Sequence, residues 1–268
     1  MVTALPPEVG LELHGAVALI LLQDAARHNA LSPVLVSGAL QALQQSRDMG
    51  AKAVVFCTTA ANFCAGADIR EMLASDWLFA HNGNPDRPSP PVLFEAIESD
   101  PRPMVAAVRG MVLGGGVELT LACDLVLAAD DAVFSLPEIG LGVVPNTAMA
   151  RLPAIIGRRA ALELILSRRR IPANEALGLG LINRVVTRER LLDEARGLAE
   201  GIVAGAPPAA IAAVKNGMGH ATAWSQVQAS LARMDSAEWG EGLSAFLARR
   251  KPDYERFWNA AAHREQER

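Results

Sequence analysis

Short apolar runs alternate with helical patterns along the first two thirds of the chain. Four runs bounded by Gly, Pro, Asp or Asn predict buried strands, at 16–22, 52–57, 103–108 and 124–129. Three stretches between them have the apolar spacing of helices, at 33–47, 67–74 and 115–123. Strands and helices that alternate in this way predict crossover connections, and therefore an α/β core.

Helical periodicity prevails from about residue 155 onward. The predicted helical segments are 158–168, 188–204, 208–218 and 222–249, with breaks at Pro172, Pro207 and Pro208. Residues 75–92 are polar and contain four prolines, so they predict a long surface loop, a kind of segment that is often functional. We therefore expect a mostly helical C-terminal third.

The composition of the 268 residues is that of an ordered globular protein, with 51% hydrophobic and 20% charged residues. A net charge of −4 argues against nucleic-acid binding, because phosphate neutralisation needs a basic surface. The three cysteines show no metal or disulfide spacing. With no leader-like N-terminus and no apolar run of about 18 residues, we expect a soluble cytoplasmic protein that has no membrane partner.

Several common catalytic motifs are missing from the sequence. It has no phosphate-binding GxxxxGK[ST], no GxGxxG, no HExxH and no GxSxG, and its five histidines are scattered. Phosphoryl transfer, dinucleotide binding and zinc hydrolysis therefore have no sequence support, and we expect no metal site. Three other segments remain as candidates for chemistry.

The first candidate is the glycine run Gly114–Gly116, which follows the predicted strand 103–108 and opens an apolar helix. Successive glycines let the backbone approach a ligand, and free amides at a helix start can donate to an anion. Glu118 is the only charged residue between Arg109 and Asp124, so this helix should bury it at a cost unless the carboxylate is paired or used. A tight turn with an acid that stabilises the helix start is the alternative interpretation.

The second and third candidates are Phe63–Ile69 and Leu136–Gly142. Small residues around Asp68 leave amides exposed, although Asp68 can equally be a plain helix cap. Glu138 lies in a stretch with no other charge from Ala132 to Ala150. If Glu118 and Glu138 meet, their repulsion makes one of them hold a proton, and the pair can act as an acid beside a base.

These segments resemble the crotonase (enoyl-CoA hydratase/isomerase) family. The matching blocks are FCAGADI at 63–69, GGGVELTLACD at 114–124 and PEIGLGVVP at 137–145, with weaker matches at 175–186 and 245–254. The resemblance implies a spiral of repeated ββα turns over 1–200 and a helical C-terminal region over 201–268 that mediates trimers. It also implies an oxyanion hole formed by the amides of Ala67 and Gly115.

The resemblance further implies roles for both glutamates and a binding region for coenzyme A. Glu118 would activate water for attack at Cβ, and Glu138 would hold that water and exchange a proton at Cα. The implied acyl-CoA contacts are Ala26, Arg27, His28, Cys64, Ala65, Gly66, Asp68, Ile69, Arg70, Gly114, Pro137, Asn146 and Lys251. The implied partner is an acyl-CoA substrate whose coenzyme A is the only cofactor-like group, and the implied assembly is a homotrimer or a dimer of trimers.

One segment departs from the family pattern. The chain reads PNTAMARL at 145–152, where the family commonly has a glycine-rich sequence one residue longer. The presence of both glutamates favours an enoyl-CoA hydratase, which adds water syn to a 2-enoyl-CoA thioester. The altered segment keeps open another acyl-CoA enzyme of this scaffold (an isomerase, a decarboxylase or a specialised dehydratase) or a catalytically silent acyl-CoA-binding subunit.

Overall fold

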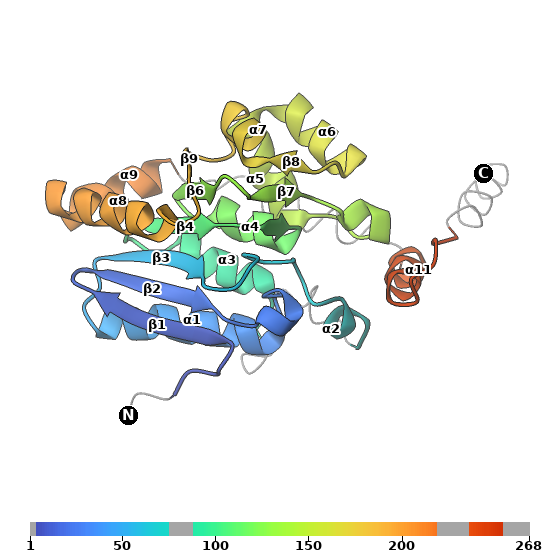
Figure 1. Ribbon diagram of the computed structural model, residues 1–268, viewed down its shortest axis with the longest axis horizontal. Coiled ribbons are helices and arrows are strands. Elements are labelled where there is room, and N and C mark those ends of the chain that lie inside the picture. Colours follow the sequence, from blue (N-terminus) through green and yellow to red (C-terminus); the bar gives the residue numbers. More distant parts are fainter. Residues whose placement is uncertain (1–3, 75–87, 219–235, 254–268) are drawn as a thin grey trace.

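The largest element of the fold is a six-stranded, mostly parallel sheet. The computed structural model describes residues 4–74, 88–218 and 236–253 (Figure 1). In spatial order the strands are β1 (Val9–His14), β2 (Val17–Leu22), β3 (Ala53–Thr58), β4 (Met104–Val108), β6 (Leu125–Ala129) and β9 (Arg184–Val186). Only the β1–β2 pair is antiparallel. The four strands predicted from apolar runs are confirmed as β2, β3, β4 and β6.

A second, smaller sheet takes its strands from the same turns of the chain. It contains β5 (Met111–Leu113), β7 (Val133–Ser135) and β8 (Ile171–Pro172). Strands β4 and β5 follow each other directly, as do β6 and β7, so each turn of the chain adds one strand to each sheet. An isolated parallel bridge between Cys64 and Val112 brings the segment after β3 into the same arrangement. Because of this repeat, the three segments that follow Cys64, β5 and β7 lie at the same edge of the small sheet.

Both faces of the large sheet are buried. Alternate residues of β2 show the division, since Leu19 and Leu21 face one core and Ile20 and Leu22 face the other. Helix α8 (Leu191–Gly205) covers the face formed by Leu19 and Leu21, and Figure 1 shows this helix beside the sheet. On the other side lie α1 (Pro33–Asp48), α3 (Pro90–Glu98) and α4 (Gly115–Ala122).

The remaining helices are short. They are η1 (Ala25–Arg27), α2 (Ile69–Ala74), η3 (Glu138–Leu141), α5 (Asn146–Ile156), α6 (Arg158–Ser167), α7 (Ala173–Gly178), α9 (Pro208–Gly217) and α11 (Ser236–Leu247). Helix α11 stands beside the main body in Figure 1 and packs its Leu243 against Met72 of α2 and Val143. Most predicted helices are confirmed within a few residues.

Two sequence predictions need correction or restriction. The predicted loop 75–92 runs too far, because α3 begins at Pro90. Proline is favoured at the first helical position, where its missing N–H costs nothing, so Pro90 and Pro91 start a helix here and do not prevent one. Residues 75–87 of that loop and 222–235 of the predicted helix 222–249 lie outside the described residues, as do 219–221 and the tail from 254.

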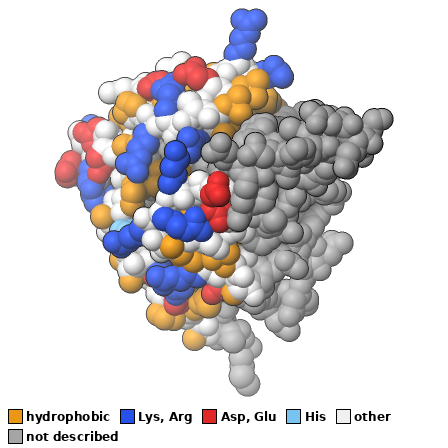
Figure 2. Space-filling view, turned by 90° about the vertical axis from the view of Figure 1, so that its right-hand side faces the viewer, with side chains coloured by type: hydrophobic (Ala, Val, Ile, Leu, Met, Phe, Trp, Pro, Cys, Tyr) orange, Lys and Arg blue, Asp and Glu red, His pale blue; other side chains and the backbone are white. Residues whose placement is uncertain are grey.

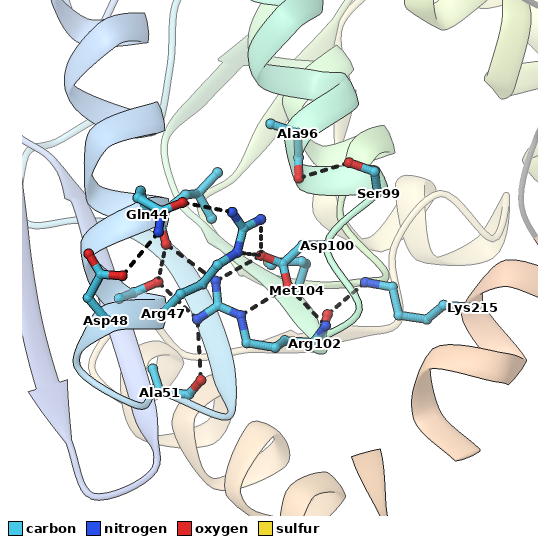
Figure 3. Close-up of polar contacts among 12 residues, drawn as sticks. Gln44, Arg47, Asp48, Ala51, Ala96, Ser99, Asp100, Arg102, Met104 and Lys215 are labelled. Atoms are coloured by element: carbon cyan, nitrogen blue, oxygen red, sulfur yellow. Dashed lines mark hydrogen bonds and ion pairs between the residues drawn. The ribbon is translucent and has the colours of Figure 1, made fainter. Parts of the chain in front are cut away.

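A buried polar network ties α1, the turn before β4 and α9 together (Figure 3). The fully buried side chain of Asp100 accepts hydrogen bonds from Arg102 and Arg47, with N···O distances of 2.8 Å to both guanidinium groups. Arg102 also donates to the hydroxyl of Ser46 and to the carbonyl of Ala51. Lys215 of α9 donates to the carbonyl of Arg102 and pairs with Asp124 at 2.7 Å, which fixes α9 to the core.

Among the described residues, no single helix has the length and apolar character needed to cross a membrane. The α8–α9 pair passes the same test only when the two helices are taken together, and they meet at a bend of 109°.

Candidate active site

Three sequence segments meet at one edge of the small sheet. Cys64 is paired in parallel with Val112, and Val112 with Phe134. Ala67, Gly115 and Pro137 each follow one of these paired residues by three positions. The register therefore brings all three to the same edge of the small sheet. The carboxyl ends of parallel strands are where α/β proteins form ligand crevices. The three candidate segments of the sequence are therefore neighbours in space.

Glycines let two of these segments approach closely. Gly66 and Gly114 have positive φ angles of 94° and 53°, a backbone conformation that residues with a side chain rarely adopt. A Cβ atom on Gly66 would lie 2.9 Å from the carbonyl oxygen of Leu113, and one on Gly116 would lie 2.5 Å from that of Cys64. Any side chain at these positions would push the start of α4 away from the 64–67 segment.

The close approach sets two backbone amides side by side. A Cβ atom on Gly115 would lie 3.4 Å from the amide nitrogen of Ala67, and one on Gly66 would lie 3.2 Å from the nitrogen of Gly115. Neither amide donates to an acceptor within the described part of the chain. Two neighbouring free donors, one of them at a helix start, can bind an oxygen that develops negative charge.

Glu118 is held by the start of another helix. It lies in the first turn of α4, and its Oε1 accepts a hydrogen bond from the amide of Ala148 in α5 at 3.0 Å. Burial raises the pKa of Glu118, whereas the amides of Ala148 and Thr147 and the charge of Arg151 oppose that rise. The free amides of a helix start favour a negative charge, so this carboxyl has a built-in partner for its ionised form.

Glu138 has the opposite surroundings. It opens η3 directly after Pro137, and a Cβ atom on Gly114 would lie 2.9 Å from its Oε1. Both carboxyl oxygens are buried and have no hydrogen-bond partner among the described residues. Burial, followed by the negative charge of Glu118, raises the pKa of Glu138 to about 8.

The two carboxyl groups therefore favour different protonation states. Among the described residues, the amides of Ala148 and Thr147 and the charge of Arg151 favour a negative charge on Glu118, whereas on Glu138 only its own backbone amide does so, as the smallest effect on its pKa. When the pair carries a single negative charge, this charge rests on Glu118 and the proton rests on Glu138. Such a pair can accept a proton at one carboxyl and donate a proton from the other at neutral pH.

The segment 145–152, which departs from the family pattern, contacts the site through the Ala148 amide that holds Glu118. Pro145 precedes α5, and Asn146 is its first residue. Asn146 is buried, and its Oδ1 has no partner among the described residues. The same helix carries Arg151, which sequence reasoning did not select although it is the first charged residue after Glu138.

The two segments expected to bind coenzyme A lie against each other. The amide of Ala65 donates to the carbonyl of His28, and the amide of Leu31 donates to the carbonyl of Gly66 at 2.7 Å. The buried Asn29 links them further, since its Nδ2 donates to the carbonyls of Asn62 and Phe63. Cys64 is buried and Ala26 is exposed beside them.

The charged candidates differ in how free they are. Arg27 is paired with Asp24 at 2.8 Å and with Asp68 at 3.6 Å, so its charge is largely balanced. Asp68 also accepts from the amide of Arg70 and caps α2, which Ile69 begins. Arg70 and Lys251 are exposed, and Figure 2 shows that Lys and Arg side chains gather on the described part of the face where α11 lies.

The described residues contain no group of three or more His, Cys, Asp or Glu side chains placed to hold a metal ion. Among the residues that the structure describes at this edge of the small sheet, the two carboxyl groups and the two amides are the groups suited to acid–base chemistry and to binding an oxyanion.

Comparison with known proteins points to one family. The model of the enoyl-CoA hydratase/isomerase family matches residues 12–257. A probable enoyl-CoA hydratase of Rhizobium meliloti is 36% identical over 259 residues, covering 91% of this chain and 96% of that protein. A 2,3-dehydroadipyl-CoA hydratase of Escherichia coli is 34% identical, covering 89% of this chain and 94% of that protein.

The fold comparison agrees with the sequence comparison. A crystal structure of methylmalonyl-CoA decarboxylase superimposes with a TM-score of 0.81 at 28% identity, covering 94% of this chain and 98% of that one. The predicted crotonase-like fold, an α/β spiral with a helical C-terminal region, is thereby confirmed.

Proposed function

The chain belongs to the enoyl-CoA hydratase/isomerase family and is an acyl-CoA enzyme of that family, and from this premise we propose that it is an enoyl-CoA hydratase. The proposed reaction is the reversible syn-addition of water to a 2-enoyl-CoA thioester. The observation that carries the proposal is the presence of two neighbouring carboxyl groups, Glu118 and Glu138, near the free amides of Ala67 and Gly115.

The two amides are proposed to bind the thioester oxygen. As they draw electron density from the conjugated double bond, Cβ becomes open to attack by water. The enolate that forms has its negative charge on that oxygen, where the amides stabilise it. In other enzymes one such donor lowers the barrier by about 3–4 kcal/mol.

The two carboxyl groups are proposed to move the protons. Glu118 takes a proton from water while the water oxygen forms the bond to Cβ, and the electron pair of the double bond moves to the enolate. Glu138 helps to hold the water and gives its proton to Cα as the enolate collapses. The pair then exchanges its proton to restore the starting state, and the same steps in reverse remove water.

Coenzyme A is proposed to lie along the joined 26–31 and 64–70 segments. The exposed Arg70 and Lys251 are the better candidates for its phosphate groups, because Arg27 already faces Asp24 and Asp68. The expected homotrimer or dimer of trimers belongs to the same proposal. It is supported by the apolar side chains of Val214 on α9 and of Met218 directly after it, which are 60% and 78% exposed in the single chain.

A decarboxylase is the second candidate. The fold match to methylmalonyl-CoA decarboxylase and the altered 146–150 segment favour it. Decarboxylation also forms an enolate that two amides can stabilise, but it does not need water to be activated. It therefore leaves Glu118 without a function as base, which is why hydration is preferred.

The test is an assay of purified protein with crotonyl-CoA and with longer and branched 2-enoyl-CoA thioesters, followed by loss of the conjugated ultraviolet absorbance. We expect loss with at least one of them, and a fall of about 10²–10⁴-fold in Glu118→Gln and in Glu138→Gln. Glu95→Gln, on the exposed side of α3, serves as the matched control and should keep the wild-type rate. If no thioester is hydrated, the proposal is wrong.

A further inference from the structure

Arg151 is a buried cation on the helix whose Ala148 amide holds the proposed base. Its side chain is 10% exposed, and it lies on α5 three and four residues after Ala148 and Thr147, whose amides hold Glu118. Residues at this spacing share one face of a helix. The Arg151 side chain therefore lies one helical turn along α5 from the amide that holds Glu118.

Arg151 is itself anchored. Its Nε donates to Oε1 of Glu98 at the end of α3 at 3.2 Å, and its second terminal nitrogen pairs with Oε2 of the same carboxylate. Helices α3 and α5 both pack on α4, so the ion pair joins the two neighbours of the helix that carries Glu118. A rigid, bidentate pair of this kind fixes both position and charge.

The charges around Glu118 can be stated element by element. Helix α5 supplies Arg151, α3 supplies Glu98 and the exposed Glu95, and η3 supplies Glu138, whereas β5 supplies none. Burial raises the pKa of Cys64 to about 12, so its thiol adds no charge. Among these described groups Arg151 is the one cation; the other three, Glu95, Glu98 and Glu138, are acids, and Glu98 is the ion-pair partner of Arg151.

We propose that Arg151 is a positioning residue for Glu118, and that its charge adds to the hydrogen bond from the Ala148 amide in keeping Glu118, and not Glu138, ionised so that Glu118 can act as the base. The proposal rests on the hydratase function for the role of the base, but the charge state it assigns belongs to the resting protein. A purely structural ion pair would predict that either partner can be removed with the same effect.

The test compares two variants that both break the ion pair. Arg151→Met removes the positive charge, whereas Glu98→Gln leaves it in place. With the cation gone, the pKa of Glu118 should rise, so the acid limb of the kcat/KM profile should move up by about one pH unit, close to a tenfold loss on that side. Glu98→Gln should leave that limb in place or move it down, and Arg151→Lys should restore most of the wild-type profile.

Equal losses at every pH in Arg151→Met and Glu98→Gln, or limbs that move in the same direction, would overturn the proposal. If Arg151→Met does not fold, as judged by circular dichroism, Glu98→Gln alone still decides. An upward shift in that variant contradicts a role for the charge, and an unchanged or downward limb supports it.

A second readout separates this inference from the hydratase proposal. Infrared titration of the carboxyl stretch follows Glu118 without substrate, in a Glu138→Gln background where Glu118→Gln identifies the band. The midpoint should rise by about one pH unit when Arg151→Met is added. An unchanged midpoint overturns the inference even in an active enzyme, whereas a shifted midpoint supports it even if no thioester is hydrated.

Discussion

Glu118 and Glu138 show at the scale of single residues how much the sequence could predict. Each is a lone charge in an apolar stretch, which marked both as costly to bury and therefore as candidates for chemistry. Their different roles could not be predicted, because these depend on contacts with residues far along the chain. One such contact is the hydrogen bond from the amide of Ala148, which is 30 residues from Glu118 in the sequence. Another is the ion pair between Arg151 and Glu98, which are 53 residues apart.

The unpartnered carboxyl of Glu138 should reduce the stability of the protein at high pH. Because its folded pKa is raised from 4.5 to about 8, the folded state holds this proton more tightly than the unfolded state does. The stability that the bound proton provides is complete below about pH 4.5 and is lost as the pH rises to about 8. Linkage sets a ceiling of about 5 kcal/mol on the loss.

Glu138→Gln imitates the protonated side chain at every pH. We therefore expect its free energy of unfolding to equal that of the wild type near pH 4 and to exceed it increasingly up to pH 8. Urea unfolding across this range measures the difference. A gap that stays constant with pH, or that closes at high pH, would show that Glu138 is not held in this state.

The limits of sequence reasoning are different at the scale of elements. The strands β2, β3, β4 and β6 were predictable because each is a buried run of five or six residues. Strands β5 and β7 have only three residues each, too few to show a periodicity, yet their register brings the site together. Pro90 and Pro91 were taken for loop residues, although prolines at that position can equally begin a helix.

Close packing between α4 and the 64–67 segment is the property of these elements that can be tested most simply. Gly116→Ala places a methyl group 2.5 Å from the carbonyl oxygen of Cys64, so α4 must shift and the amides of Gly115 and Ala67 must separate. We expect a loss of roughly 1–3 kcal/mol in stability together with a large loss of activity.

Gly197→Ala is the matched control, because it lies in α8 with nothing within 4 Å of the new methyl group. Alanine favours helix more than glycine does, so this variant should gain up to about 1 kcal/mol and keep its activity. Thermal unfolding and the hydration assay measure both effects. Full activity in Gly116→Ala would show that the spacing of the two amides does not matter.

At the scale of the whole molecule, the Asp100 network joins distant parts of the chain (Figure 3). Burial opposes the ionisation of Asp100, but the hydrogen bonds and charges of Arg102 and the charge of Arg47 outweigh it, so the pKa is lowered. The stability that this carboxylate provides is therefore present above its ordinary value of 3.8 and is lost as the pH falls through its folded value.

Asp100→Asn should leave the guanidinium of Arg102, with a side chain only 11% exposed, without its counter-charge. We expect a loss of roughly 3–5 kcal/mol at neutral pH that becomes smaller in acid. Chemical unfolding at several pH values tests this, with the exposed Asp48→Asn of α1 as a control that should change stability by less than about 0.5 kcal/mol. A loss that is the same at all pH values would rule out the electrostatic explanation.

By the proposed function, this molecule adds water to an enoyl thioester by means of Glu118 and Glu138. The most direct measurement is mass spectrometry of the product formed from crotonyl-CoA in ¹⁸O-labelled water. We expect the wild type to form a product heavier than the substrate by one labelled water, and this product should be almost absent with Glu118→Gln and Glu138→Gln. A wild-type product of unchanged mass, or labelled product formed equally by the two variants, would contradict it.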